Sequence, residues 1–110
     1  MACGVTRAKR DGKEGMAMTF EWDEDKDQRN RQKHGVEFDE AKTVFGNSNS
    51  MTISDPEHSY EEDRFLELGI SSQGRVLVVS YTERGTNIRI ISCRKANKSE
   101  RRFYEQTNEI

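Results

Sequence analysis

The chain has 110 residues, of which 32% are hydrophobic and 35% are charged, and its formal net charge at pH 7 is −2. This length is typical of a single domain with a modest core. No apolar run approaches the roughly 20 residues that a membrane-spanning helix needs, and the N-terminus lacks the apolar segment of a secretory signal. We therefore expect a cytoplasmic protein that makes no contact with a membrane.

Residues 1–17 are small, polar and slightly basic, and they show no hydrophobic periodicity. Such a segment has too little apolar surface to offset the entropy that it loses on ordering. We expect residues 1–17 to be a disordered extension and residues 18–110 to form the single domain.

A short strand is expected at 19–22, followed by a helix over 24–34. Asp23 suits the N-cap of this helix, and Gly35 suits its C-terminal stop. The helix contains no apolar residue, but four polar residues share one side of it at helical spacing: Lys26, Asn30, Lys33 and His34. Two interpretations remain open, a fully solvated helix or a polar stripe that faces a functional cleft.

An apolar stripe that ends at Gly46 predicts a second short helix, and a strand is expected at 51–54 before a turn at 55–59. Three strands then follow at 63–71, 75–82 and 87–95, the last two joined by a hairpin. Their order predicts an α+β fold: a short N-terminal strand, two helices, an antiparallel meander and a C-terminal helix that opens with a capping box at Asn97. The predicted core is Val76, Leu77, Val78, Val79, Ile88 and Ile90, packed with Phe38, Val44 and Phe45.

Charge is segregated along the chain. The stretch from Glu37 to Glu67 carries nine acidic residues against two basic ones, whereas Arg84 to Tyr104 carries seven basic residues against one acidic residue. The basic stretch includes the strand 87–95, whose isoleucines alternate with Arg89 and Arg94. Arginine in a strand is typical of phosphate binding, but it also protects edge strands from aggregation. Segregated charge suggests a polyanion or an acidic protein as partner, or attraction between the two halves of the fold.

The sequence has no glycine-rich phosphate loop, no nucleophile elbow, and no cysteine or histidine pair at zinc spacing. We therefore expect no metal and no cofactor. What remains is a set of cations with a few proton carriers, namely Lys33, His34, Glu62, Arg64, Arg84, Arg89, Arg94 and Tyr104. That set suits metal-free cleavage of RNA, which needs a base for the 2′-hydroxyl, an acid for the leaving oxygen and cations for the phosphorane.

Each of these residues also has an ordinary structural interpretation. Histidine changes charge near neutral pH, so His34 could act as base or acid, but at a helix end it is more often a dipole partner. Glu62 could exchange a proton if burial raised its pKa, or it could form a weak surface ion pair with Arg64.

A series of short motifs resembles the BrnT toxin family. It begins with Phe20-Glu-Trp-Asp23, Lys26, Asn30, Lys33-His-Gly-Val36 and Phe38-x-x-Ala41-x-x-Val-Phe45, and it continues with Arg64, Gly69-x-Ser71, Gly74-Arg75, Thr82-x-Arg84, Arg89-Ile-Ile-Ser92, Arg94-x-Ala96, Glu100-Arg101 and Tyr104. These motifs run in order over residues 20–105, and residues 1–17 have no counterpart. Glu37 and Cys93 depart from the pattern, where a serine-like cap and a small residue are usual.

The resemblance implies a RelE-like ribonuclease toxin of a type II toxin–antitoxin pair that cleaves RNA and blocks translation. Its implied partner is a BrnA-like antitoxin with a ribbon-helix-helix part, which binds operator DNA and brings two toxin copies together. The candidate catalytic residues are His34, Lys33, Glu62, Arg64, Arg84 and Arg94, and the candidate phosphate-binding residues are Arg89, Lys95 and Lys26. The competing hypothesis is a non-catalytic module whose basic face binds nucleic acid or an acidic protein.

Overall fold

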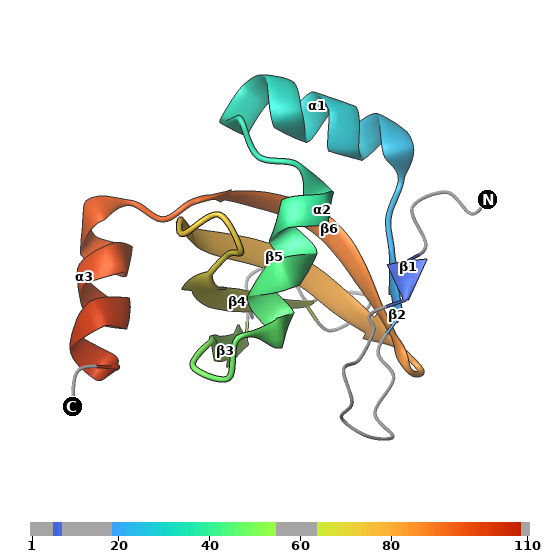
Figure 1. Cartoon of the computed structure of the whole chain (residues 1–110). Coiled ribbons are helices and arrows are strands. Elements are labelled where there is room, and N and C mark those ends of the chain that lie inside the picture. The colour runs from blue at the N-terminus through green and yellow to red at the C-terminus, as the bar shows by residue number, and fades with distance from the viewer. Residues whose placement is uncertain (1–5, 8–18, 55–63, 109–110) are drawn as a thin grey trace.

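The computed structural model describes residues 6–7, 19–54 and 64–108, which form one six-stranded sheet with helices around it (Figure 1). The elements, in chain order, are β1 (Thr6–Arg7), β2 (Thr19–Glu21), α1 (Glu24–His34), α2 (Phe38–Ala41), the 3₁₀ helix η1 (Lys42–Gly46), β3 (Met51–Ser54), β4 (Arg64–Ile70), β5 (Val76–Arg84), β6 (Asn87–Lys95) and α3 (Lys98–Thr107). The α+β class is confirmed. No helix among these residues is long and apolar enough to cross a membrane.

The strands follow the order β1-β2-β6-β5-β4-β3. Strands β3 to β6 pair antiparallel with their chain neighbours, whereas β2 pairs parallel with β6. The described part of the expected N-terminal extension, β1, pairs antiparallel with β2. The rest of residues 1–17 and the expected turn at 55–59 lie outside the described residues, so the disorder of the extension stays a prediction.

Helix α1 begins and ends where its terminal residues dictate. The Asp23 side chain accepts a hydrogen bond from the backbone N–H of Asp25 at 2.8 Å and caps the helix. Gly35 ends the helix in the left-handed conformation, with φ of 73°, which costs little only for glycine. Asn30 is the one buried residue of α1. Packing of apolar side chains therefore contributes little to holding α1 on the sheet.

The larger hydrophobic core lies between α2, η1 and one face of the sheet. Leu77, Val79 and Tyr81 of β5 point into it, together with Ile88, Ile90 and Cys93 of β6. Phe38, Ala41 and Val44 of the helical segment complete it, and the Phe45 ring packs against Tyr81 with centroids 4.9 Å apart. We call this side of the sheet the α2 face.

A second, smaller core lies on the opposite face, beneath α3. It contains Leu68, Val78, Ala96 and Tyr104, with Val76, Leu66 and Met51 partly buried beside them. The prediction of one core that includes both Val76 and Val78 is therefore wrong. The side chains of successive residues in a strand point to opposite faces, so Val76 and Val78 cannot share a core with Leu77 and Val79.

A β-bulge in β6 changes which side chains share a face. Cys93 is opposite Val79 and Ser92 is opposite Ser80, but the next pair joins Ile90 to Tyr81, so Ile91 is an extra residue. Without it, the strict alternation of a strand would place Arg89 and Arg94 on opposite faces, because they are an odd number of residues apart. The bulge restores both to the same face.

Candidate active site

The strand arginines gather on the face of the sheet opposite α2. Arg64 of β4 lies opposite Thr82 of β5, which lies opposite Arg89 of β6. Arg84 follows Thr82 by two residues, and Arg94 lies opposite Val78. Directly opposed residues point to the same side, so Arg64, Arg84, Arg89 and Arg94 share one face. We call this side the arginine face.

Three of these arginines form a group at the hairpin end of the strands, around Thr82, which is fully buried. Arg89 Nη1 donates to Glu21 Oε2 at 3.1 Å, and Glu21 is the residue opposite Arg89 in β2. Asn87 also donates to the Glu21 carboxylate, at 3.3 Å. These bonds fix the direction in which Arg89 points and leave most of its five N–H donors for other acceptors.

Arg94 is held at the other end of the same face. Its Nη1 and Nη2 donate to the two carboxylate oxygens of Glu100 at 2.8 and 2.9 Å, the two-bond geometry that arginine also forms with phosphate. Hydrogen bonds from Arg94 lower the pKa of Glu100, and the same pair raises the pKa of Arg94. Because Glu100 also closes the capping box of α3, Arg94 ties the start of that helix to the sheet.

The two ends of the arginine face are too far apart to act on one phosphate. The residue opposite Arg94 is Val78, six residues before Arg84. At the rise of an extended strand this separation is roughly 20 Å. Arg84 and Arg94 were predicted as catalytic together; the register allows them to contact the same RNA but not the same phosphate.

Asn30, a member of the polar stripe of α1, lies against the open edge of β6. Strand β2 pairs with β6 only as far as Arg89, so beyond that point no strand of the described residues pairs with this edge of β6. Asn30 takes the place of a strand: its Nδ2 donates to the carbonyl of Cys93 at 2.8 Å, and its Oδ1 accepts from the backbone N–H of Cys93 at 3.1 Å. The same Nδ2 donates to the carbonyl of Val36 at 3.0 Å. Asn30 thus attaches α1 to β6 by polar contacts, in place of an apolar face.

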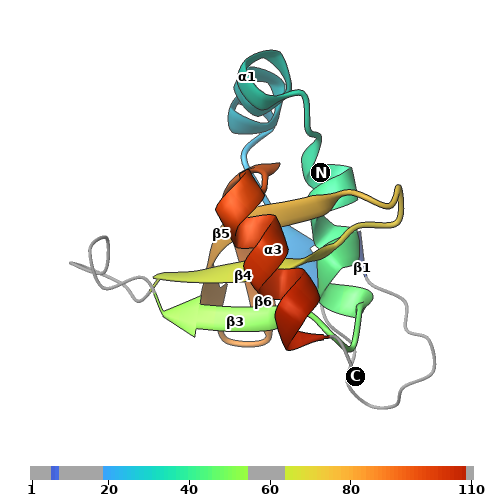
Figure 2. The same cartoon turned by 90° about the vertical axis from the view of Figure 1, so that its left-hand side faces the viewer.

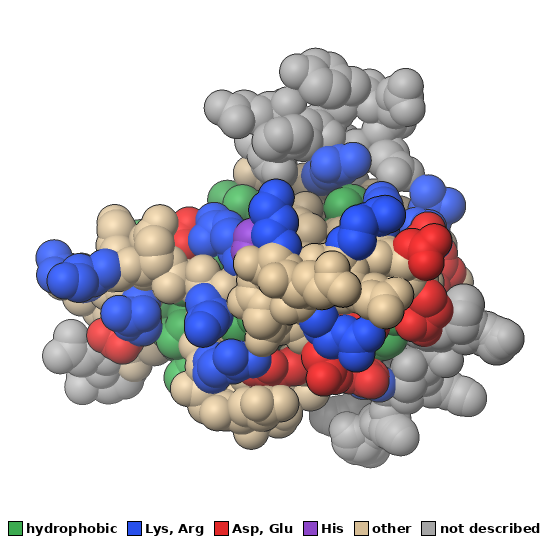
Figure 3. Space-filling model, turned by 90° about the horizontal axis from the view of Figure 1, so that it is seen from above, with side chains coloured by type: hydrophobic (Ala, Val, Ile, Leu, Met, Phe, Trp, Pro, Cys, Tyr) green, Lys and Arg blue, Asp and Glu red, His purple; other side chains and the backbone are tan. Residues whose placement is uncertain are grey.

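Helix α1 runs along β6 in the same direction, so its C-terminal end lies beside the C-terminal end of that strand (Figure 1). His34 follows Asn30 by one turn and points to the same side of the helix. Lys33 is exposed and His34 is half-buried. Seen from above, Lys and Arg side chains spread over this part of the molecule, with one histidine among them (Figure 3). Lys26 is exposed in the first turn of α1.

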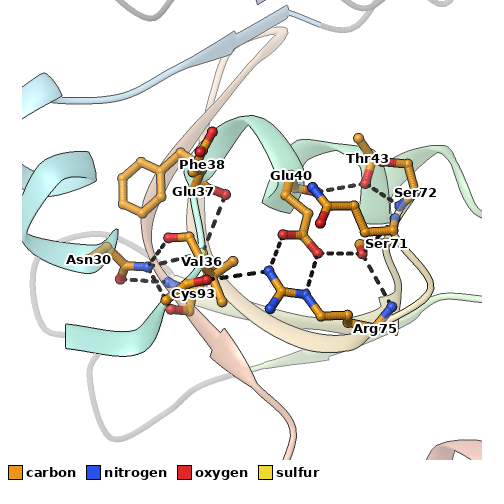
Figure 4. A network of polar contacts seen from close by, with 12 residues as sticks. Asn30, Val36, Glu37, Phe38, Glu40, Thr43, Ser71, Ser72, Arg75 and Cys93 are labelled. Atoms are coloured by element: carbon orange, nitrogen blue, oxygen red, sulfur yellow. Dashed lines mark hydrogen bonds and ion pairs between the residues drawn. The ribbon is translucent and has the colours of Figure 1, made fainter. Parts of the chain in front are cut away.

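A network around Glu40 fixes the segment that follows α1 (Figure 4). Arg75 Nε donates to Glu40 Oε2 at 3.0 Å, and its Nη2 donates to the other oxygen and to the carbonyl of Gly35 at 3.3 Å. Ser71 Oγ donates to Glu40 Oε2 at 2.6 Å. The hydrogen bonds from Arg75, then Ser71, lower the pKa of the buried Glu40 against the opposing effect of burial. Lys95 lies near this network, on the α2 face, because it is opposite Leu77.

Cys93 is a core residue rather than a reactive one. Burial raises the pKa of its thiol to about 12, so the thiolate is scarce at neutral pH. Asn30 Nδ2 lies 3.3 Å from the sulfur. Cys93 therefore serves packing and the attachment of α1.

The predicted site residues thus divide by position. Arg64, Arg84, Arg89 and Arg94 share the arginine face; Lys26, Lys33 and His34 are on α1; Lys95 is on the α2 face; Glu62 lies outside the described residues. Glu40, Ser71 and Arg75 had no predicted role in the site, although Ser71 and Arg75 belong to the motifs of the family resemblance. Within the described ranges, no group of three histidine, cysteine or acidic residues is placed to hold a metal ion.

Comparisons with protein families and with solved structures each found a match. Residues 22–100 match the family model described as the ribonuclease toxin, BrnT, of type II toxin–antitoxin systems. The crystal structure of the Brucella abortus ribonuclease toxin BrnT is similar, with a TM-score of 0.52 and 25% sequence identity. The match covers 70% of this chain and 94% of the Brucella chain. No curated protein matches the chain.

Proposed function

Because the chain belongs to the BrnT family of ribonuclease toxins of type II toxin–antitoxin systems, we propose that it is an endoribonuclease that cleaves RNA across its arginine face. The observation that carries the proposal is the register that brings Arg64, Arg84, Arg89 and Arg94 to one face. Four guanidinium groups on one face suit a chain of phosphates, because guanidinium N–H donors match phosphate oxygens. Both Nη atoms of Arg94 bond Glu100, so we propose that Arg94 contacts a phosphate through its remaining N–H donors.

We place the chemical step at the end of β6 and propose that Arg94 and the C-terminal end of α1 act there together. The ribose 2′-oxygen attacks the adjacent phosphorus, and the bond from phosphorus to the 5′-oxygen breaks. Arg94 stabilises the extra negative charge on the phosphorane, with Lys33 nearby. His34 exchanges a proton with the 2′-hydroxyl or with the leaving 5′-oxygen. The products are a 2′,3′-cyclic phosphate and a 5′-hydroxyl.

The group of arginines at the hairpin end then binds neighbouring phosphates of the same strand. At the rise of an extended strand, Arg84 lies roughly 20 Å along the sheet from the residue opposite Arg94, and Thr82, the residue opposite Arg89, lies roughly 13 Å from it. These distances support a binding role for Arg84 and Arg89 rather than a role in the bond breakage. Arg64 belongs to the same group, and Glu62 precedes it by two residues in the sequence. If His34 proves dispensable, we propose Glu62 as the proton carrier in its place.

In the cell, we propose a RelE-like mode of action. The enzyme would cut RNA in the cytoplasm without a metal ion and so block translation. A BrnA-like antitoxin with a ribbon-helix-helix part would neutralise it, with two toxin copies on one antitoxin dimer. Operator DNA would be bound only through the antitoxin.

The test is a cleavage assay with purified protein and end-labelled RNA in buffer that contains EDTA. We expect cleavage with 2′,3′-cyclic ends at an undiminished rate. Arg94→Ala should lower kcat by roughly 100-fold or more, as for the loss of one stabilising group in a preorganised site. Arg84→Ala and Arg89→Ala should raise KM with a smaller effect on kcat. RNA that binds and stays intact would favour the non-catalytic module instead.

A further inference from the structure

The largest exposed apolar side chains among the described residues all belong to the layer that α3 forms with the arginine face. Phe103 of α3 is 52% exposed, Ile53 of β3 is 41% exposed and Ile70 of β4 is 38% exposed. Ile53 lies opposite Leu66, and Ile70 lies opposite Val76, so both point to the side on which Tyr104 packs. Ile53 and Ile70 are four residues apart along the register of β4 with the buried Leu68 between them, so they border the core beneath α3 on two sides. Exposed apolar side chains that border a core can extend it into an interaction site.

Strand β3 is a short edge strand that carries neither of the two residue types, charged residues and proline, that often protect an edge. It is the last strand in the sheet order, and within the described part of the chain nothing pairs with its outer side. Its sequence is Met-Thr-Ile-Ser, with no charged residue and no proline. Natural edge strands usually carry lysine, proline or a bulge that prevents pairing with another chain. Figure 2 shows β3 and β4 passing behind α3, and Met51 of β3 packs against the core that contains Tyr104 of α3.

The charges around this region favour an acidic partner. Lys98, Arg101 and Arg102 of α3 are exposed. Of the two acidic residues in α3, Glu100 is neutralised by its two bonds to Arg94, which leaves Glu105. The helix therefore presents a net positive border beside the apolar side chains.

We propose that this surface, defined by Ile53, Ile70, Phe103 and the basic residues of α3, is where the antitoxin binds, through an amphipathic segment with an acidic border. The inference rests on the proposed function, because an antitoxin exists only for a toxin. Binding there places the segment on α3, the helix that Arg94 ties to the sheet through Glu100. An antitoxin bound to α3 would sit beside Arg94 and exclude RNA from it.

A second copy of this chain is a poorer occupant. In a two-fold symmetric dimer the same surface meets itself, so the exposed cations of α3 would face their own copies. Like charges placed across an interface oppose association. A partner with carboxylates at the same positions gains from the same cations.

The experiment uses the full chain, with the product of the neighbouring reading frame as the antitoxin probe. The variant is Ile53→Ser with Phe103→Ser, and the matched control is Ser54→Ala with Gln106→Ser, which changes exposed neighbours on the same two elements. Three quantities are measured for each: Kd for the antitoxin, the rate of RNA cleavage without antitoxin, and the oligomeric state of the free toxin. Circular dichroism checks that each variant is folded.

We expect the apolar variant to raise Kd at least about 30-fold, as for truncation of central anchors, while cleavage stays at the parental rate. The control should keep the parental Kd. Arg101→Glu with Arg102→Glu should also raise Kd, and more so at low salt. An unchanged Kd in the apolar variant overturns the inference. The inference is also overturned if the free parental toxin is a dimer and the apolar variant is a monomer. With either of these outcomes, the proposed function still stands if the parental toxin cleaves RNA. A parental toxin that neither cleaves RNA nor binds the antitoxin refutes both the proposed function and the antitoxin-binding surface.

Discussion

Replacing Asn30 with alanine tests how α1 is held on the sheet. The Asn30 amide satisfies the backbone N–H and carbonyl of Cys93 and also the carbonyl of Val36. In Asn30→Ala these three groups lose their partner, and each buried polar group left unsatisfied costs about 1–3 kcal/mol. Because water can reach some of them once the side chain is gone, we expect a loss of about 2–4 kcal/mol in the free energy of unfolding.

Asn30→Asp separates this account from a simple loss of volume. The aspartate keeps one acceptor for the Cys93 N–H but turns a carboxylate oxygen toward two carbonyl oxygens. Burial and this repulsion should raise the pKa of the new carboxyl in the folded protein. The variant should therefore be least stable at neutral pH and should recover as the pH falls, because the protonated carboxyl can donate.

The assay is denaturant unfolding at pH 7 and pH 5, with Gln32→Ala as the control, since Gln32 is exposed on the same helix. Hydrogen exchange should also show faster opening of α1 in Asn30→Ala than in the parent. A stability of Asn30→Ala within 0.5 kcal/mol of the parent, about the effect of an ordinary surface substitution, would mean that other contacts hold α1 and that our reading of Asn30 is wrong.

Four further outcomes are expected. Val78→Ala and Ile90→Ala should each lower the free energy of unfolding by about 1–4 kcal/mol. Because the two residues belong to separate cores, the effects should add in the double variant. An effect of the double variant far from the sum of the single effects would contradict the two-core arrangement. Because the pKa of Glu40 is lowered in the folded protein, its carboxylate stabilises the fold above the ordinary pKa of a glutamate, and this stabilisation is lost as the pH falls through the lowered pKa. In Glu40→Gln, the free energy of unfolding should therefore fall less steeply with decreasing pH than in the parent. An equally steep fall would mean that other carboxylates cause the loss of stability in acid. Cys93 should resist alkylation in native protein and react on unfolding, as mass spectrometry can show; rapid native labelling would mean that the thiol is accessible. Deletion of residues 1–17 should leave cleavage and antitoxin binding intact, whereas a large fall in Tm would show that the extension is docked.

Local signals in the sequence were enough to place several elements. Helix α1 begins after Asp23, whose side chain caps the helix, and it ends at Gly35, because glycine tolerates a positive φ. The Asn97 capping box likewise opens α3. These features depend on residues within a few positions of one another, so they can be read without knowledge of the tertiary structure.

The candidate site depended on features that lie far apart in the sequence. Nothing in the local pattern of isoleucine and arginine marks Ile91 as a bulge, yet the bulge decides that Arg89 and Arg94 share a face. The polar stripe on α1 was recognised, but the bond between Asn30 and Cys93 joins residues 63 positions apart. Arg75 and Glu40 were missed as a pair for the same reason, since they are 35 positions apart.

The central claim is that Arg94 acts in the chemical step, and single-turnover RNA cleavage tests it most directly. The comparison is Arg94→Ala and Arg94→Lys against Arg31→Ala, which removes an equal charge from the exposed side of α1, with circular dichroism to confirm that each protein is folded. Arg94→Ala should cleave roughly 100-fold more slowly than the parent at saturating RNA, and Arg94→Lys should recover part of that loss, because charge returns without the two-bond fork. Arg31→Ala should cleave at the parental rate. A folded Arg94→Ala protein that cleaves RNA as fast as Arg31→Ala would contradict the account.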